Sequence, residues 1–373
     1  MHILFAGGGT AGHINPALAV ADYIVSNHKD AKISYIGTER GLESRLVRAA
    51  GYDFYPIEVA GFQRKLSLQN IKRNISAVRM MITSSIEARK ILKTLKPDVV
   101  VGTGGYVSGP VLREAAKLKI RTCIHEQNAF PGITTKALAS MVDTVMLAMP
   151  EAEKYLKCKN KPVVTGNPVR SAMTLVDKAL AKEKVGAGDR PVIISFGGSL
   201  GARPINEAVV GVISHFAESG KYYHLHAPGK RGYEDTVTLL REKLDFTKYS
   251  NVEIREYIDD MDVCMAAADL VICRSGAITL SELQNCGKPS VLIPSPYVAE
   301  NHQFHNAMTL KKAGAAEVIE EKDLTADRLI KTISYMVDNK EALEKMSQNA
   351  KNSAISDANE RIYNEIMKLF TVA

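Results

Sequence analysis

A histidine follows a run of glycines near the start of the chain, and this combination could perform acid–base chemistry beside a bound phosphate. Residues 7–13 read GGGTAGH, directly after an apolar segment at residues 2–6. A glycine-rich turn between a strand and a helix presents backbone N–H groups and the positive end of the helix to an anion. Because histidine side chains can exchange protons near neutral pH, His13 could be a general base, a phosphate donor or a structural loop residue.

A second acid–base pair lies in the middle of the chain. His125 and Glu126 stand a few residues before Pro131 and Gly132. Glu126 could orient a histidine or act as the base itself. Either side chain could instead cap the turn before Pro131, so both interpretations stay open.

Two further turns, in the second half, could also bind anions. Residues 197–202 read GGSLGA, and Ser199 could donate to a diphosphate oxygen or cap the next helix. Residues 274–279 read RSGAIT and lead into a helix that carries Glu282. That carboxylate could interact with the helix dipole, or it could accept the two hydroxyls of a ribose.

The first glycine turn also fits a dinucleotide-binding fingerprint. Gly7, Gly9 and Gly12 match GxGxxG, but the nearest acid, Glu39, stands 27 residues past Gly12, where the fingerprint expects about 20. A dehydrogenase is therefore an alternative, and so is a turn whose glycines only allow tight packing. The second glycine turn disfavours both, because two such turns suit a phosphate on one side and an acceptor on the other.

We expect no metal and no cofactor. Residues 260–262 read DMD, similar to the DxD that binds manganese in another transferase class. The acids at 259–262 precede a helix predicted at 263–268, so we predict that they cap it. The five cysteines are never spaced as CxxC, which argues against a zinc site or disulfide frame and for reduced thiols in a cytosol.

The apolar segments predict the elements that position these turns. The predicted strands are at residues 2–6, 33–36, 99–101, 191–196, 252–254, 270–273 and 290–293. Helical patterns separate them, which is typical of parallel sheets covered on both faces. We predict two doubly wound α/β domains facing across a cleft, at residues 1–168 and 169–354. A C-terminal helix at about 355–373 is expected to pack back on the first. Ligands of such sheets bind at the carboxyl ends of the strands.

Length and charge set the remaining limits. A chain of 373 residues with 46% apolar and 24% charged residues suits two soluble domains. Its first residues lack the pattern of a signal peptide, and no apolar run approaches a membrane span. The net charge is +7, but residues 61–96 alone carry +8. The basic character is therefore local, and we do not predict nucleic-acid binding.

That basic segment also contains a helical apolar stripe. Its members are Leu68, Ile71, Ile75, Val78, Ile82 and Ile86, flanked by Lys72, Arg73, Arg79 and Arg89. Such a stripe can face a protein core or a membrane surface. The excess of one charge sign favours an anionic membrane, to which each basic residue contributes about 1 kcal/mol.

Six motifs together resemble the GT-B family of UDP-N-acetylglucosamine transferases that act in peptidoglycan synthesis. They are GGGTAGH at 7–13, GGYVSGP at 104–110, HEQN at 125–128, GNPVR at 166–170, GGSLGA at 197–202 and CRSGA at 273–277. They span nearly the whole chain in the family's order. The departures are Ala11 for a glycine, Leu200 for a frequent glutamine, and His302 where Gln-Gln is frequent.

The resemblance implies a hexosyltransferase with two Rossmann-like GT-B domains. It implies inverting transfer of N-acetylglucosamine from UDP-GlcNAc to the C4 hydroxyl of the MurNAc-pentapeptide of lipid I, an undecaprenyl-pyrophosphate acceptor, to give lipid II. It also implies a peripheral protein on the cytoplasmic face of the plasma membrane, with other cell-wall synthesis proteins as further partners. Another GT-B glycolipid transferase and a non-catalytic sugar-nucleotide scaffold are the alternatives.

The resemblance also implies roles for individual residues. The catalytic candidates are His13 and Glu126. The UDP-GlcNAc site would comprise Thr10, Ala11, Gly12, Asn128, Arg170, Ser199, Ile258, Ala277, Ile278, Thr279, Leu280, Ser281, Glu282 and Gln303. The acceptor diphosphate would lie on Gly8, Gly9, Gly104, Gly105 and Tyr106. The membrane contact would be made by Leu68, Ile71, Lys72, Arg73, Ile75 and Arg79.

Overall fold

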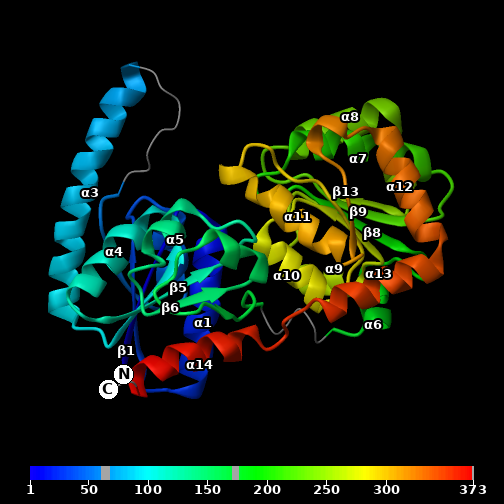
Figure 1. Cartoon of the computed structure of the whole chain (residues 1–373). Coiled ribbons are helices and arrows are strands. Elements are labelled where there is room, and N and C mark those ends of the chain that lie inside the picture. Colours follow the sequence, from blue (N-terminus) through cyan, green and yellow to red (C-terminus); the bar gives the residue numbers. More distant parts are fainter. Residues whose placement is uncertain (60–67, 170–175, 372–373) are drawn as a thin grey trace. The chain divides into compact units, whose positions relative to one another are not determined.

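The chain forms two compact units (Figure 1). The computed structural model describes residues 1–59, 68–169 and 176–371, without the side chains at 68–79, 81 and 82. Unit 1 comprises Met1–Pro168 and Ser356–Ala373, and unit 2 comprises Val169–Ile355. The last helix of the chain therefore belongs to the same unit as the first strand.

Unit 1 is built on a seven-stranded parallel sheet in the order β3-β2-β1-β4-β5-β6-β7. Its strands are β1 (His2–Gly7), β2 (Lys32–Gly37), β3 (Asp53–Pro56), β4 (Val99–Gly104), β5 (Arg121–Glu126), β6 (Thr144–Leu147) and β7 (Val163–Val164). The strands predicted at 2–6, 33–36 and 99–101 are confirmed.

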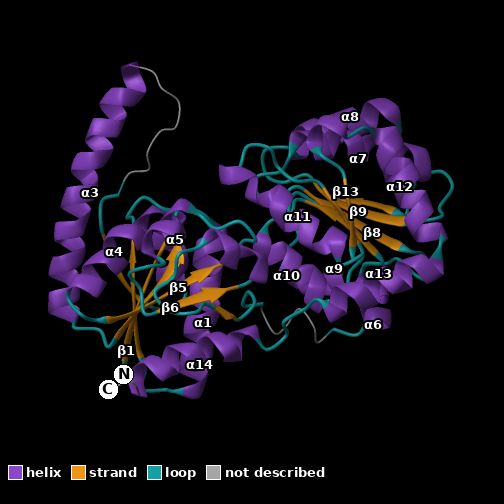
Figure 2. Ribbon diagram, viewed as in Figure 1, coloured by secondary structure: helices purple, strands orange, loops and turns teal. Residues whose placement is uncertain are grey.

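Helices cover both faces of this sheet (Figure 2), because successive strand residues point to opposite sides. In β1, Leu4 packs with the core beneath α3 and α4, whereas Phe5 packs with the core beneath α1 and α14. The helices of unit 1 are α1 (Ala11–Asn27), α2 (Leu42–Ala49), α3 (Leu68–Leu95), α4 (Gly105–Lys117), α5 (Ile133–Leu138), the 3-10 helix η1 (Pro150–Tyr155) and α14 (Ala358–Thr371).

Unit 2 repeats the architecture with six parallel strands in the order β10-β9-β8-β11-β12-β13. The strands are β8 (Val192–Phe196), β9 (Tyr223–Ala227), β10 (Val252–Ile254), β11 (Leu270–Cys273), β12 (Ser290–Leu292) and β13 (Ala316–Val318). The helices are α6 (Lys178–Lys184), α7 (Arg203–Phe216), α8 (Tyr233–Lys243), α9 (Met261–Ala267), α10 (Ala277–Asn285), α11 (His302–Lys312), α12 (Ala326–Asp338) and α13 (Lys340–Asn352). The prediction of two doubly wound parallel sheets is confirmed.

Each sheet reverses its strand order at one point, and the glycine turns lie there. In unit 1 the reversal falls between β1 and β4, and in unit 2 between β8 and β11. The turns at 7–12 and 104–105 follow the first pair of strands, and the turns at 197–202 and 274–276 follow the second pair. The carboxyl edge at a reversal point is where doubly wound sheets bind ligands.

A buried histidine pair lies inside the sheet of unit 2. His224 and His226 on β9 each lie 2.8 Å from the Ser195 hydroxyl on β8. Burial lowers the pKa of His224 to about 3, with a further contribution from His226, and burial lowers the pKa of His226 to about 4. Both rings are therefore neutral in the folded protein at neutral pH.

We predict that this pair makes the protein sensitive to acid. The folded-state pKa values lie below the unfolded value of about 6.5, so the stabilisation is complete above pH 6.5 and is lost as pH falls toward 4. The free energy of unfolding should fall by up to about 2.7 kcal/mol per pH unit while the unfolded state carries both protons.

Urea denaturation at pH 7, 6 and 5 measures this slope. A His224→Gln variant carries one titrating ring fewer in this pair and should show a shallower slope than the unmodified protein. Equal slopes in the two proteins would contradict the prediction.

Within the described residues, no helix combines the length and the apolar character that crossing a membrane requires.

Candidate functional site

The first glycine turn is organised by a buried carboxylate. Glu43 Oε2 accepts the Gly9 N–H at 3.2 Å, and Oε1 accepts the N–H and the hydroxyl of Thr38 at 3.0 and 2.6 Å. A Cβ atom on Gly8 would lie 2.5 Å from Glu43 Oε1. The absence of a side chain at Gly8 thus leaves room for Glu43. Gly9 was predicted to contact an acceptor phosphate, but its N–H donates to the Glu43 carboxylate.

Glu43 is ionised in this position. Burial raises its pKa, but the hydrogen bonds from Thr38 and Gly9 outweigh burial and hold the pKa below its usual value. A negative charge therefore lies beneath the turn and fixes its conformation.

The second glycine turn packs directly on the first. Gly104 and Gly105 have φ of 99° and 77°, values that glycine tolerates better than other residues. A Cβ on Gly105 would lie 2.2 Å from Gly8 O, and a Cβ on Gly104 would lie 2.8 Å from His13 Nδ1. Ser108 accepts the Gly104 N–H at 3.0 Å and so closes this turn. The two glycine turns and His13 therefore lie against one another. The exposed Tyr106 directly follows Gly105 in the sequence.

His13 is connected to the HEQN motif. Its Nδ1 lies 3.1 Å from Gln127 Oε1. Gln127 Nε2 donates to His125 O at 2.9 Å and lies 3.1 Å from His125 Nδ1. His125 Nε2 in turn lies 2.9 Å from Gly166 O. His13 is half-buried, whereas His125 and Gln127 are buried. The buried Gln127 therefore contacts the inward-facing nitrogen of the His13 ring.

Glu126 shapes the turn that follows β5. Its Oε1 accepts the backbone N–H and the side-chain amide of Asn128, each at 3.0 Å, and its Oε2 accepts the Gly132 N–H at 3.0 Å. These contacts favour the interpretation in which Glu126 caps the turn before Pro131 over the interpretation in which it is a base. The same contacts fix the orientation of Asn128.

Unit 2 contains a cavity of about 530 Å³ at the carboxyl edge of its sheet. Ser199, Ile258, Thr279 and Glu282, four residues of the predicted nucleotide site, line it together. Ala277, Leu280 and Ser281 are buried in α10, and they do not line this cavity. The helix thus presents Thr279 and Glu282 to the cavity and the other three to the core.

One alternative for these residues can now be decided. Ser199 does not cap α7, because that helix begins at Arg203 and the residue at its N-cap is Ala202. Glu282 lies in the second turn of α10, which begins at Ala277, so an interaction with the helix dipole and a contact with a ribose both stay open.

The acids at 259–262 lie at the start of the next helix, as predicted, with Asp260 at the N-cap of α9 and Asp262 in its first turn. The Asp260 side chain, however, makes no capping hydrogen bond. Its Oδ1 accepts from Arg255 at 2.8 Å instead. The guanidinium offers a charged donor, which binds a carboxylate more strongly than a backbone N–H does.

A second cavity, of about 540 Å³, is lined by Gly197, Gly201 and Ala202 of the 197–202 turn. Gln303, Tyr297 and Arg274 are among its lining residues. Gln303 Oε1 accepts the Ser295 N–H at 2.9 Å, which fixes the side-chain amide. Arg274 forms an ion pair with Glu321 and donates to Ile293 O at 3.1 Å. This cavity therefore shares the 197–202 turn with the cavity of about 530 Å³.

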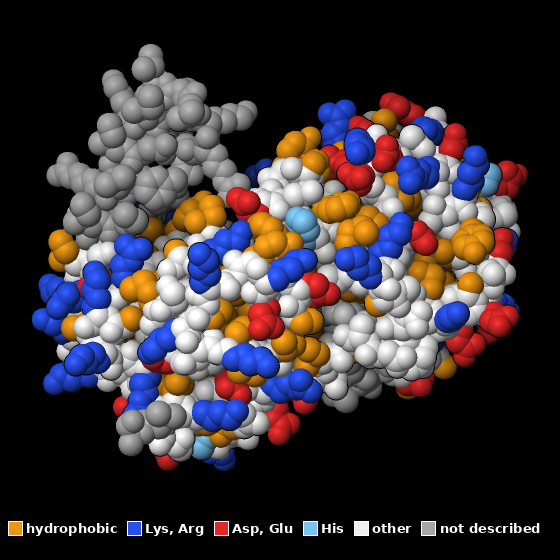
Figure 3. All heavy atoms as spheres, viewed as in Figure 1, with side chains coloured by type: hydrophobic (Ala, Val, Ile, Leu, Met, Phe, Trp, Pro, Cys, Tyr) orange, Lys and Arg blue, Asp and Glu red, His pale blue; other side chains and the backbone are white. Residues whose placement is uncertain are grey.

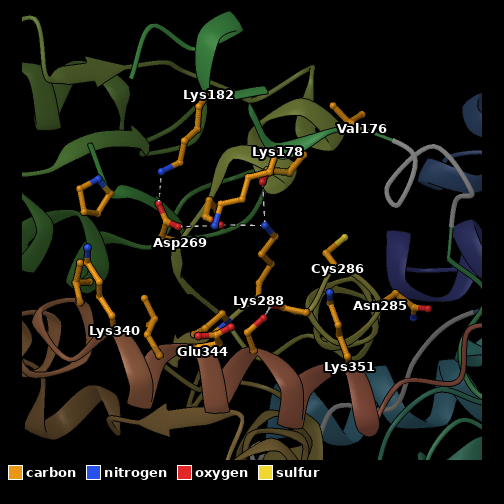
Figure 4. Close-up of a pocket in the computed structure, with 18 of the residues that line it drawn as sticks. Val176, Lys178, Lys182, Asp269, Asn285, Cys286, Lys288, Lys340, Glu344 and Lys351 are labelled. Carbon is orange, nitrogen blue, oxygen red and sulfur yellow. Dashed lines mark hydrogen bonds and ion pairs between the residues drawn. The ribbon is translucent and has the colours of Figure 1, made fainter. Parts of the chain in front are cut away.

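A larger cavity at the opposite, amino edge of the same sheet has a different character (Figure 4). Lys178 and Lys182 both pair with Asp269, and Lys288 donates at 2.9 Å to Ala266 O and Ala268 O. Burial lowers the pKa of Lys288 to about 8. These lysines are engaged with groups of the protein itself, so the cavity resembles a structural ion-pair network more than a ligand site.

Several predicted residues cannot be placed. Arg170 lies outside the described residues, as do the side chains of Leu68, Ile71, Lys72, Arg73, Ile75 and Arg79. Thr10, Ala11, Gly12 and Asn128 belong to unit 1, at the start of α1 and after β5.

Sequence reasoning missed two residues of the site. Gln127 belongs to the HEQN motif, but the motif predicted no role for it. No motif included Glu43. No spacing rule connects Glu43 with Gly9 or Gln127 with His13, because only the fold brings these pairs together.

Comparison with known proteins gives a consistent result over the whole chain. Residues 3–147 match the glycosyltransferase family 28 N-terminal domain, and residues 192–362 match the C-terminal domain of the same family. The chain is 48% identical over 369 residues to a protein of Acetivibrio thermocellus, covering 99% of this chain and 98% of that protein. It is 45% identical over 370 residues to a protein of Ruminiclostridium cellulolyticum, covering 99% and 100%.

Both relatives are UDP-N-acetylglucosamine–N-acetylmuramyl-(pentapeptide) pyrophosphoryl-undecaprenol N-acetylglucosamine transferases. Among solved structures, the chain is similar to Acinetobacter baumannii MurG, with a TM-score of 0.78 and 28% identity over 98% of this chain and 99% of that one. A UDP-GlcNAc 2-epimerase from Neisseria meningitidis bound to UDP-GlcNAc shares the fold, with a TM-score of 0.67, 14% identity and coverage of 99% and 100%.

Proposed function

This chain belongs to glycosyltransferase family 28, and from that membership we propose that it transfers N-acetylglucosamine from UDP-GlcNAc to undecaprenyl-linked lipid I. The product is lipid II, the disaccharide-pentapeptide precursor of peptidoglycan. The near-complete coverage of relatives with this activity supports the proposal, because both the N-terminal and the C-terminal domain are retained.

The donor binds to unit 2. The observation that carries this assignment is the cavity lined by Ser199, Ile258, Thr279 and Glu282. A carboxylate at Glu282 can accept the two ribose hydroxyls, and the N–H groups that begin α10 face the diphosphate. Gln303 and Arg274 border the adjoining cavity and serve the phosphate and the sugar.

The acceptor binds to unit 1. The packed glycine turns form a surface without side chains at positions 8, 9, 104 and 105, where a lipid-linked diphosphate can approach the backbone. Because Glu43 already accepts the Gly9 N–H and Ser108 accepts the Gly104 N–H, the N–H groups of Ala11 and Gly105, where α1 and α4 begin, supply the donors for this diphosphate.

The reaction is one in-line displacement at C1 of the donor sugar. His13 takes the proton of the acceptor C4 hydroxyl while its oxygen forms the bond to C1. The bond between C1 and the phosphate oxygen breaks, and UDP leaves with the electron pair. The donor is α-linked, so one displacement gives a β-linked product. The N-terminus of α10 and the 197–202 turn stabilise the charge that develops on UDP.

Unit 1 also carries the proposed membrane contact. The described end of α3 and the loop that follows it expose Arg89, Lys90, Lys93 and Lys96. Figure 3 shows Lys and Arg side chains gathered over unit 1. Ile86, the described member of the predicted stripe, has an exposed fraction of 64%, whereas Ala88 and Leu92 are buried. Ile86 therefore lies at the surface, and the side chains of the other stripe members lie outside the described residues. We propose that the protein binds to the inner face of the plasma membrane.

A transfer assay tests the proposed function. UDP-[¹⁴C]GlcNAc and lipid I should give labelled lipid II, whereas UDP-glucose with diacylglycerol should give no labelled lipid. Transfer should persist in excess EDTA, because helix termini face the leaving diphosphate. Transfer from UDP-glucose to diacylglycerol, without transfer to lipid I, would show that the chain is a different glycolipid transferase. Restoration by manganese after loss in EDTA would turn attention to Asp260 and Asp262.

A further inference from the structure

We propose that Gln127 is a positioning residue that holds His13 in the tautomer with its proton on Nδ1, so that Nε2 carries the free lone pair for the acceptor hydroxyl. The inference rests on the proposed function for its consequence in catalysis. The tautomer itself can be established without any substrate.

The orientation of the Gln127 amide follows from its contact with a carbonyl. Nε2 lies 2.9 Å from His125 O, and a carbonyl oxygen can only accept a hydrogen bond. The amide nitrogen must therefore face His125, which turns Oε1 toward His13. Because Oε1 is an acceptor, His13 Nδ1 at 3.1 Å must be the donor.

A second carbonyl fixes the other end of the network. His125 Nε2 lies 2.9 Å from Gly166 O, so this nitrogen is the donor. His125 Nδ1 then accepts from Gln127 Nε2 at 3.1 Å, in agreement with the amide orientation. Burial lowers the pKa of His125, so the ring stays neutral and keeps Nδ1 as an acceptor.

The other ring nitrogen of His13, Nε2, can accept a proton from a substrate. Among the described residues, it has no hydrogen-bond partner, and the ring is only half-buried. A neutral imidazole with one nitrogen held as a donor presents the other as a base, which is how a second group makes a histidine competent in general base catalysis.

The titratable groups on the neighbouring elements do not compete for this nitrogen. Glu43 accepts from Gly9 and Thr38, and Glu126 accepts from Asn128 and Gly132. His125 is held by Gly166 and Gln127. Tyr35, buried near Gly7, has a raised pKa because of burial and the charge of Glu43, so it stays protonated.

The first test is nitrogen-15 NMR of the imidazole rings in the unmodified protein, with the His13 signals assigned from a His13→Asn variant. The expected spectrum shows a protonated Nδ1 and an unprotonated Nε2 at a pH where the ring is neutral. A proton on Nε2 would overturn the proposal, whatever reaction the protein catalyses.

The second test compares two variants. Gln127→Met removes the acceptor and should give a mixture of His13 tautomers and about a tenfold lower kcat, with unchanged affinity for UDP. Gln127→Glu places a carboxylate against Nδ1, which should move the acidic limb of the pH–rate profile upward by about one pH unit or more. Gln284→Met is the matched control, because it removes side-chain hydrogen bonds to Ser353 in unit 2. It should change neither kcat nor the pH–rate profile.

A role in packing alone gives a different pattern. If Gln127→Met folds and keeps both the tautomer and kcat, the proposal is overturned. An unmoved pH–rate profile in Gln127→Glu would also overturn it. Absence of lipid II synthesis by the unmodified protein would refute the proposed function and leave the NMR result to decide the tautomer.

Discussion

Replacing His13 with alanine is expected to lower kcat by roughly 10²–10⁴-fold, the contribution of a general base, while the affinity for UDP stays unchanged. The Nδ1 atom of His13 is held by Gln127, and the ring is half-exposed beside the glycine turns. The acidic limb of the pH–rate profile should vanish with the ring, because that limb reports imidazole protonation. Steady-state kinetics with lipid I, together with UDP titration, measures all three quantities.

The contrasting role for His13 is a contact with the acceptor phosphate. In that case the loss appears mainly in the acceptor KM, and the acidic limb survives. His13→Asn separates the two roles, because asparagine can donate a hydrogen bond but cannot take a proton at neutral pH. A near-normal kcat in His13→Asn would exclude the base role. His28→Ala is a suitable control, since His28 ends the same helix and contacts Tyr363 away from the turns.

Replacing Glu282 with alanine should weaken UDP binding by roughly 1–3 kcal/mol, or about 5- to 150-fold in Kd. The physical reason is the loss of charge-assisted hydrogen bonds to the ribose hydroxyls in the cavity of unit 2. Calorimetric titration of the variant with UDP gives Kd directly.

Glu344→Ala is the matched control for this measurement. Glu344 is a helical glutamate of the same unit that lines the cavity at the opposite edge of the sheet. It should leave the UDP Kd unchanged. Unchanged affinity for UDP in Glu282→Ala would show that Glu282 does not contact the ribose. Weakened affinity for UDP in Glu344→Ala would contradict a nucleotide site at the carboxyl edge of the unit 2 sheet.

The fold was predictable because its strands carry a strong local signal. Runs such as 191–196 are apolar except for Ser195, as is typical of strands buried on both faces, and glycine turns mark where they end. β5 escaped prediction because Arg121, Thr122, His125 and Glu126 dilute its apolar residues. Of these, Thr122, His125 and Glu126 are buried and form specific hydrogen bonds, which no local sequence pattern predicts.

Sequence motifs pointed to Ser199, Thr279 and Glu282, and these three residues line one cavity. They follow β8 and β11, the strands at which the order of the sheet reverses, so a doubly wound fold brings them to the same edge. Glu43 and Gln127 act on other protein groups, across 34 and 114 residues of sequence. Such tertiary pairs are visible only once both partners have been placed.

The acids at 259–262 show a further limit. Their position before a helix suggested capping, but Arg255, five residues upstream of Asp260, supplies a charged donor that the capping rule does not consider. Arg255 directly follows β10, and the loop between it and α9 brings the guanidinium to Asp260.

The central claim is a single displacement onto the C4 hydroxyl of lipid I, and the structure of the product tests it most directly. After reaction of the protein with UDP-GlcNAc and lipid I, proton NMR of the released disaccharide should show a β(1→4) linkage. The new anomeric proton should show the large coupling of a diaxial pair, and one UDP should form per disaccharide. An α linkage, attachment at another hydroxyl, or free N-acetylglucosamine in place of the disaccharide would contradict the account.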